Sequence, residues 1–186
     1  MASKIKALFS RPKGQAMAEF SMALPILLFV VVGLLEVGRA VFMYASVVNA
    51  SREAVRYATA YGVDENDVPN VQNCAAIRNT ARRVGFLLPL EDDGDIVINY
   101  DTGPDPVTGV TPPPYASCDA VEGDATNGVD TSIELACGDR VVVEVKTTYN
   151  PILPLIFPLQ NHEFKSSSAR TFLGIVELTA DAPECN

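Results

Sequence analysis

The chain has 186 residues and a formal net charge of −9 at pH 7, from 14 basic and 23 acidic side chains. Residues 1–14 carry four basic and no acidic side chains, so the remaining chain has a net charge of −13. A surface this acidic repels nucleic acid, and we expect no nucleic-acid partner. The length suits one domain together with an anchoring segment.

An apolar run follows the basic segment. No charged residue occurs from Phe20 to Leu35, and apolar residues continue on both sides of this run. A membrane-spanning helix needs about 20 mostly apolar residues, which predicts a transmembrane segment over residues 18–38. A secretory signal peptide would end in a cleavage site after a shorter apolar core, and no such break is present. Basic residues stay on the cytoplasmic side, so we expect the bulk of the chain to lie outside the cytoplasm.

The helical pattern extends beyond the apolar run. We predict one helix over residues 15–61, about 70 Å long at 1.5 Å per residue, with a kink at Pro25 because proline removes a backbone hydrogen bond. Alternating spacings of four and three residues predict a packing seam along one face: Val37, Val41, Tyr44, Val48, Ser51, Val55 and Ala58. Glu36 and Arg39 are three residues apart and are expected to neutralise each other in part near the membrane surface.

A carboxylate, Glu19, stands at the start of the apolar run, where a charge costs a few kcal/mol of insertion free energy. It is one of several short motifs in residues 11–61: the basic leader ending in Gly14, Glu19-Phe20, Leu24-Pro25, Glu36-Val37-Gly38-Arg39 and the run Asn49–Ala58. Together these motifs resemble the N-terminus of TadE-like proteins, which are minor pilins (pseudopilins) of the tight-adherence, or Flp, branch of type IV pilus systems. The stretch CGDRVVVEVKTTYNPILPLIFP is similar, less distinctively, to the C-terminal half of that family.

The resemblance implies that an inner-membrane prepilin peptidase cuts between Gly14 and Gln15, which makes Glu19 the fifth residue of the mature chain. It also implies that Glu19 and the adjacent Phe20 set the register of neighbouring subunits, because the carboxylate pairs with the new N-terminal amine of a neighbour. A second interpretation is that Glu19 complements the positive end of its own helix, a contribution of about 0.3–1 kcal/mol. The two roles are compatible.

Shorter elements are predicted after Gly62. Residues 74–86 are expected to form a short helix, residues 95–100 a strand, and residues 101–130 a long irregular loop. Two stronger strands follow at 140–149 and 163–173, predicted to pair antiparallel.

The two strong strands are joined by residues 151–159, a proline-containing crossover. Its apolar side chains are expected to pack under the long helix, and the alternative is a loop that skims the membrane or binds a partner. The predicted fold class is therefore α+β: a long N-terminal helix, transmembrane in its first half, packed on a small disulfide-linked extracytoplasmic domain with a short helix and an antiparallel sheet. The predicted divisions are a cytoplasmic leader at 1–14, the helix at 15–61 and the domain at 62–186.

All four cysteines lie in the predicted extracytoplasmic part: Cys74, Cys118, Cys137 and Cys185. They form no Cys-x-x-Cys pair, and the single histidine, His162, is near none of them in sequence, so no metal site is expected. Two disulfides in an oxidising compartment are predicted instead. Three pairings are compatible with the sequence, and proximity along the chain favours Cys118–Cys137 together with Cys74–Cys185.

No constellation typical of an enzyme is present, such as a nucleophile elbow, a glycine-rich phosphate loop or an HExxH motif. We therefore expect no catalytic activity, no cofactor and no small-molecule substrate. The acidic clusters at 91–95 and 119–130 lack the spacing of an EF-hand loop and are predicted to be solvated.

Two functions remain. The resemblance implies a structural and assembly subunit of a tight-adherence pilus, inserted once in the bacterial inner membrane and involved in pilus biogenesis, adhesion and surface colonisation. Its partners would be the prepilin peptidase, other pilin subunits and the pilus assembly platform. The alternative is an uncleaved, membrane-tethered extracytoplasmic scaffold or binding module.

Overall fold

The computed structural model describes residues 12–60, 62–63, 67–90, 92–118, 136, 138–152 and 162–172. Its elements in chain order are α1 (Pro12–Ala58), α2 (Cys74–Val84), the 3-10 turn η1 (Asp93–Asp95), β1 (Ile96–Asp101), β2 (Ala116–Ser117), β3 (Arg140–Tyr149) and β4 (His162–Thr171). This arrangement confirms the predicted α+β class.

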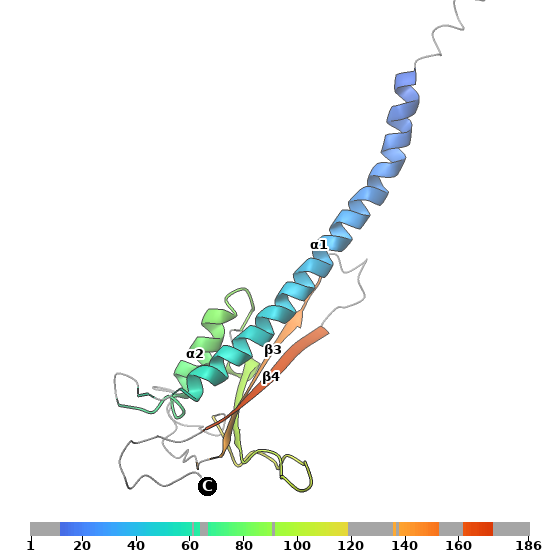
Figure 1. The fold of residues 1–186 in the computed structure, drawn as a ribbon. Coiled ribbons are helices and arrows are strands. Elements are labelled where there is room, and N and C mark those ends of the chain that lie inside the picture. The colour runs from blue at the N-terminus through green and yellow to red at the C-terminus, as the bar shows by residue number, and fades with distance from the viewer. Residues whose placement is uncertain are drawn as a thin grey trace, which may run out of the picture.

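One long helix dominates the molecule. α1 begins at Pro12, where the fixed φ of proline suits a first helical turn, and runs for 47 residues. Figure 1 shows its N-terminal half standing clear of the rest of the chain, while its C-terminal half lies against β3 and β4. The helix continues through Pro25 without a break, and the kink expected there stays a prediction.

The four strands form one antiparallel sheet in the order β2-β1-β3-β4. Alternation along β3 explains how the sheet packs: Val141, Val143 and Val145 are fully buried, while the residues between them are half-buried. β4 pairs with the whole length of β3, with Ser166 opposite Val145, as predicted for an antiparallel partner. The helices therefore cover one face of the sheet, and the core lies between these two layers.

A hydrogen bond caps each end of the short helix α2. The side chain of Asn73 accepts a hydrogen bond from the Ala76 amide at 2.9 Å and so caps the first turn. At the other end, the Gly85 amide donates to the Ala81 carbonyl at 2.8 Å. The predicted helix over residues 74–86 is confirmed, with an end two residues earlier.

The predicted disulfide pairing was wrong. Cys74, the first residue of α2, is bonded to Cys118, which follows β2, and their Cα atoms are 5.9 Å apart. The cause is β2 itself, a two-residue strand inside the segment that was predicted to be an irregular loop. Pairing of Ala116 with Tyr100 carries the next residues to the edge of the sheet beside α2, so proximity in space overrode proximity in sequence. Cys137 and Cys185 lie outside the described residues.

The seam by which α1 packs on the domain also differs from the prediction in its first half. Val37, Val41 and Tyr44 are exposed, whereas Ser51 and Val55 are buried as predicted. The buried stripe of the first half lies one position earlier, with Ala40 half-buried within it: Glu36, Met43, Val47, Ala50 and Ala54. Two neighbouring stripes on a helix have the same periodicity, so the sequence pattern favours the wholly apolar stripe that begins at Val37 over the stripe that begins at Glu36.

Candidate functional site

The predicted processing site lies at the exposed N-terminal end of α1. Gly14 and Gln15 are in its first turns, and a side chain added at Gly14 would meet no atom within 4 Å. One turn later Glu19 is exposed, and its Oε1 accepts a hydrogen bond from Gln15 Nε2 at 3.0 Å. The residues of the expected cleavage and register site, Gly14, Gln15, Glu19 and Phe20, therefore lie within two turns at the start of α1, whose N-terminal half stands clear of the folded domain (Figure 1).

Large apolar side chains cover the helix after Glu19. Within the most apolar 18-residue window of α1, the mean hydropathy is 2.4 and only 6% of the residues are buried. The exposed side chains include Phe20, Met22, Ile26, Leu27, Leu28, Phe29, Leu34 and Leu35. By length and composition this helix is able to cross a membrane. A helix that is apolar all round and uncovered by its own domain needs lipid or other helices as its surroundings.

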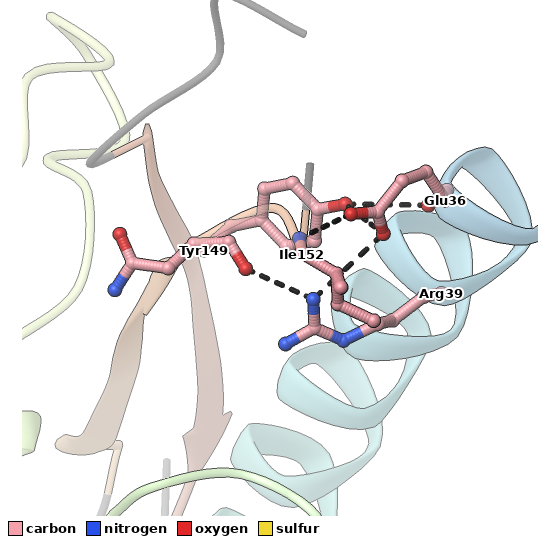
Figure 2. Close-up of polar contacts among 5 residues, drawn as sticks. Glu36, Arg39, Tyr149 and Ile152 are labelled. Atoms are coloured by element: carbon pink, nitrogen blue, oxygen red, sulfur yellow. Dashed lines mark hydrogen bonds and ion pairs between the residues drawn. The ribbon is translucent and has the colours of Figure 1, made fainter. Parts of the chain in front are cut away.

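At the point where α1 meets the domain, a buried carboxylate joins the two. Only 3% of Glu36 is exposed. Its Oε2 accepts a hydrogen bond from the Tyr149 hydroxyl at 3.2 Å, and its Oε1 accepts one from the Ile152 amide. Figure 2 shows these contacts converging from the end of β3 on one turn of α1. We call Glu36, Arg39, Tyr149, Asn150 and Ile152 the junction.

Arg39 completes the junction from the helix side. Its NH1 lies 3.8 Å from Glu36 Oε2, which confirms the expected contact between the two charges. The same nitrogen donates a hydrogen bond to the Asn150 carbonyl at 2.9 Å, and the guanidinium carbon lies 5.3 Å from the centroid of the Tyr149 ring. Buried carboxylates are stable only when hydrogen-bonded and paired, and this arrangement provides both.

Tyr149 is the part of the junction that belongs to the sheet. Burial, followed by the negative charge of Glu36 and the hydrogen bond to it, raises the pKa of the Tyr149 hydroxyl, which therefore stays a donor at neutral pH. Its ring packs on Phe164 of β4 at a centroid distance of 5.5 Å, and Phe164 in turn meets Tyr44 of α1 edge-on at 6.2 Å. Aromatic contacts thus extend the junction across both layers.

The sequence indicated part of this junction. The Glu36–Arg39 pair was expected, but Tyr149 and the backbone groups of Asn150 and Ile152 were not, because they lie more than 100 positions away in the chain. The usable signal was an isolated glutamate and arginine in an otherwise apolar helical stretch, which indicates a partner elsewhere. The chemistry of the junction is structural: it holds one helix to one sheet.

No arrangement for metal binding is present in the parts of the chain that the structure describes, where no three His, Cys, Asp or Glu side chains converge. Among the described residues of the domain, Arg140 and Asp101 form a short ion pair away from the junction. Arg140 donates two hydrogen bonds to the Asp101 carboxylate, at 2.7 and 2.9 Å, and the Gly103 amide donates a third at 2.8 Å. The hydrogen bond from Arg140 is the main cause that lowers the pKa of Asp101.

Residues 14–56 match a family model described as TadE-like protein. The matched segment lies entirely within α1 and runs from Gly14 through the Glu36–Arg39 pair, so it confirms the resemblance drawn from the sequence motifs. No curated protein and no solved structure was found to match the chain. The TadE-like segment supports a pilin-like protein associated with a tight-adherence pilus.

Proposed function

Since residues 14–56 are TadE-like, we propose that the protein is a structural and assembly subunit of a tight-adherence pilus, made as a precursor in the bacterial inner membrane. In this proposal residues 1–14 are a cytoplasmic leader, residues 18–38 span the membrane and the domain from residue 62 onward lies outside. A prepilin peptidase removes the leader, and the mature subunit joins other pilin subunits on the assembly platform and contributes to adhesion and surface colonisation.

The observation that carries the proposal is the division of α1 into two halves. The N-terminal half is apolar and exposed, and the C-terminal half is buried against a folded domain. Such a helix can stand in lipid and later pack beside the helices of neighbouring subunits, while the domain remains in water. The junction at Glu36 and Arg39 marks the change between the two environments.

The position of Glu19 supports a role between subunits. An exposed carboxylate at the edge of hydrocarbon is costly, and a neighbour's N-terminal amine would offset that cost while burying both charges together. The amine created after Gly14 would lie one helical turn before Glu19, so pairing between chains fixes their axial offset to within about one turn. The hydrogen bond from Gln15 to Glu19 holds the carboxylate toward the N-terminal end of the helix, where the amine would lie.

Substitutions at Gly14 test the processing step. Space around Gly14 is open, so Gly14→Val should leave the fold and the membrane insertion intact while blocking the close approach of the peptidase to the scissile bond. The matched control is Gly38→Val, which is also in α1 with open space around it and should be processed normally. Equal processing of both variants would remove Gly14 from the proposed site.

Substitutions at Glu19 test the assembly step. Glu19→Ala should insert as well as the native chain, because it removes a charge from the edge of the hydrocarbon, but it should not enter pili. Gln15→Ala removes the hydrogen bond to Glu19 but also changes a residue of the proposed cleavage site, so its precursor size is checked first; once cut, this variant should still assemble. Membrane fraction, precursor size and surface pili are measured for each variant. A Glu19→Ala protein that is cut, inserted and fully competent for pilus formation would show that Glu19 is only a helix-end charge.

A further inference from the structure

The junction fixes how close the domain lies to the bilayer. The hydrocarbon core is about 30 Å thick, which corresponds to about 20 residues of an untilted helix. If Glu19 lies at the cytoplasmic edge of the hydrocarbon, as its charge favours, the opposite edge is reached near Arg39. Tilt of the helix moves this edge to later residues, so the junction lies at or within the outer boundary of the acyl chains.

The end of β3 is held at that level by direct contacts. The Ile152 amide donates to Glu36 Oε1, the Asn150 carbonyl accepts from Arg39 NH1 at 2.9 Å, and the Tyr149 hydroxyl donates to Glu36 Oε2 at 3.2 Å. The last residue of β3 and two residues that follow it are thus attached to one turn of α1 (Figure 2). The domain therefore reaches the membrane boundary, and no spacer separates it from the lipid.

Exposed apolar side chains lie next to junction residues in the chain. Ile152 is 72% exposed, although its backbone is anchored to a buried carboxylate. On α1 the flanking Leu35, Val37 and Val41 are exposed as well. The residues that lead from the end of β3 to Ile152, at positions 147–152, contain no Asp, Glu, Lys or Arg, so they add no fixed charge beside Ile152. About two turns beyond Glu36 on α1, the exposed Tyr44 is of a residue type that favours the membrane–water boundary.

We propose that Ile152 is a second membrane-contact site, whose side chain enters the boundary between the head groups and acyl chains of the outer leaflet. The occupant of this exposed apolar surface is phospholipid, because the surface is continuous with the apolar face of the membrane-spanning half of α1. Two contacts, one helix and one side-chain tip, fix the orientation of the domain on the membrane. The inference rests on the proposed membrane insertion of α1 and is independent of leader cleavage and of pilus formation.

The chain contains no tryptophan, so a single introduced tryptophan reports on one position. Three full-length variants are reconstituted in phosphatidylcholine vesicles, with and without brominated acyl chains, which quench only nearby tryptophan. Ile152→Trp tests the proposal, and Val31→Trp in the apolar run is the positive control. Val107→Trp is the negative control, since Val107 is 91% exposed in a loop at the far end of the domain (Figure 1).

We expect the emission of Ile152→Trp to be quenched nearly as strongly as that of Val31→Trp and several-fold more than that of Val107→Trp. Quenching at position 31 but not at position 152 would overturn the second contact and leave the proposed function intact. A signal at position 152 that changes with the protein-to-lipid ratio and is insensitive to bromine would assign the surface to a second copy of the chain. Loss of quenching at position 31 would overturn both the inference and the proposed insertion of α1.

Discussion

Replacing Glu36 with alanine should weaken the attachment of the folded domain to α1. The substitution removes the acceptor of the Ile152 amide and one of two acceptors of the Tyr149 hydroxyl, which retains the Glu36 carbonyl at 3.3 Å. It also removes the carboxylate that pairs with Arg39. The domain would then be held to α1 by apolar packing, by the bonds from Arg39 to Asn150 and from Tyr149 to the Glu36 carbonyl, and by the contacts of Ser51 with Ser166 and Ser168 of β4.

The magnitude follows from the groups left without a partner. A buried donor that loses its acceptor costs about 1–3 kcal/mol, and the partial loss at Tyr149 adds about 1 kcal/mol or less. Alanine also removes the free-energy cost of burying the Glu36 carboxylate, and this gain offsets part of the loss. We expect Glu36→Ala to lower the free energy of unfolding by about 2–3 kcal/mol, and Glu36→Gln by about 1 kcal/mol, because glutamine keeps an acceptor for Ile152.

Glu53 provides a matched control within the same helix. Glu53 and Arg56 also lie three residues apart, with their charged atoms 3.8 Å from each other, as in the Glu36–Arg39 pair. The side chain of Glu53 is 43% exposed, so the pair is worth about 0.5 kcal/mol or less. Urea unfolding of the detergent-solubilised protein, followed by near-ultraviolet circular dichroism of its tyrosines, compares Glu36→Ala with Glu53→Ala.

A double-mutant cycle with Tyr149→Phe sharpens the test. If Glu36 and Tyr149 stabilise the fold through their shared hydrogen bond, the two substitutions together should cost less than the sum of their separate effects, by about 0.5 kcal/mol or more. The reasoning fails if Glu36→Ala costs no more than Glu53→Ala, or if the cycle shows no coupling. Either result would mean that the Glu36 carboxylate does not hold α1 to the sheet.

Three further predictions concern the rest of the domain. Asp101→Asn should lower stability at neutral pH by about 2 kcal/mol. The hydrogen bond from Arg140 is the main cause that lowers the pKa of folded Asp101. The contribution of this carboxylate to the free energy of unfolding is therefore complete above the ordinary carboxyl pKa of 3.8 and is lost as the pH falls through the lower folded pKa. Acid titration of both proteins should show the difference in their stability disappearing at low pH. The Cys74–Cys118 disulfide spans a sequence separation of 44, and its reduction should lower the free energy of unfolding by about 4 kcal/mol in the chain-entropy model. A peptide map made without reductant should contain this linked pair, and a map with either cysteine joined elsewhere would contradict it. Protease added outside spheroplasts should digest the domain beyond residue 62, and a domain protected until lysis would contradict the proposed orientation.

Local patterns in the sequence predicted the main elements of the fold. α2 begins after a capping asparagine, and β3 follows from a β-branched run that alternates between buried and half-buried positions. The long helix follows from an apolar run that continues into an alanine-rich stretch. In each element, the residues that determine its secondary structure are close together in the sequence, so a local pattern is enough to predict it.

The junction and the disulfide were not predictable in the same way, because they depend on contacts between distant segments. β2 has only two residues and gives no periodic signal, yet it carries Cys118 to the start of α2. In the first half of α1 the buried stripe lies one position before the predicted one, and its first member, Glu36, is charged. A glutamate becomes a packing residue only when the structure supplies donors, and those donors come from Tyr149 and Ile152.

The residues expected to form the processing site occupy one short motif. Gly14, Gln15 and Glu19 lie within two turns of α1, and the family match begins at Gly14. Their roles in cleavage and register remain proposals that depend on partners outside this chain.

The central claim is that the protein is a processed pilin-like subunit, and the intact mass of the chain extracted from the membrane tests it most directly. The claim predicts a chain that begins at Gln15, has lost the four basic residues of the leader and still contains the entire apolar run. A membrane-extracted chain that retains residues 1–14 would contradict it and would favour an uncleaved, membrane-tethered scaffold.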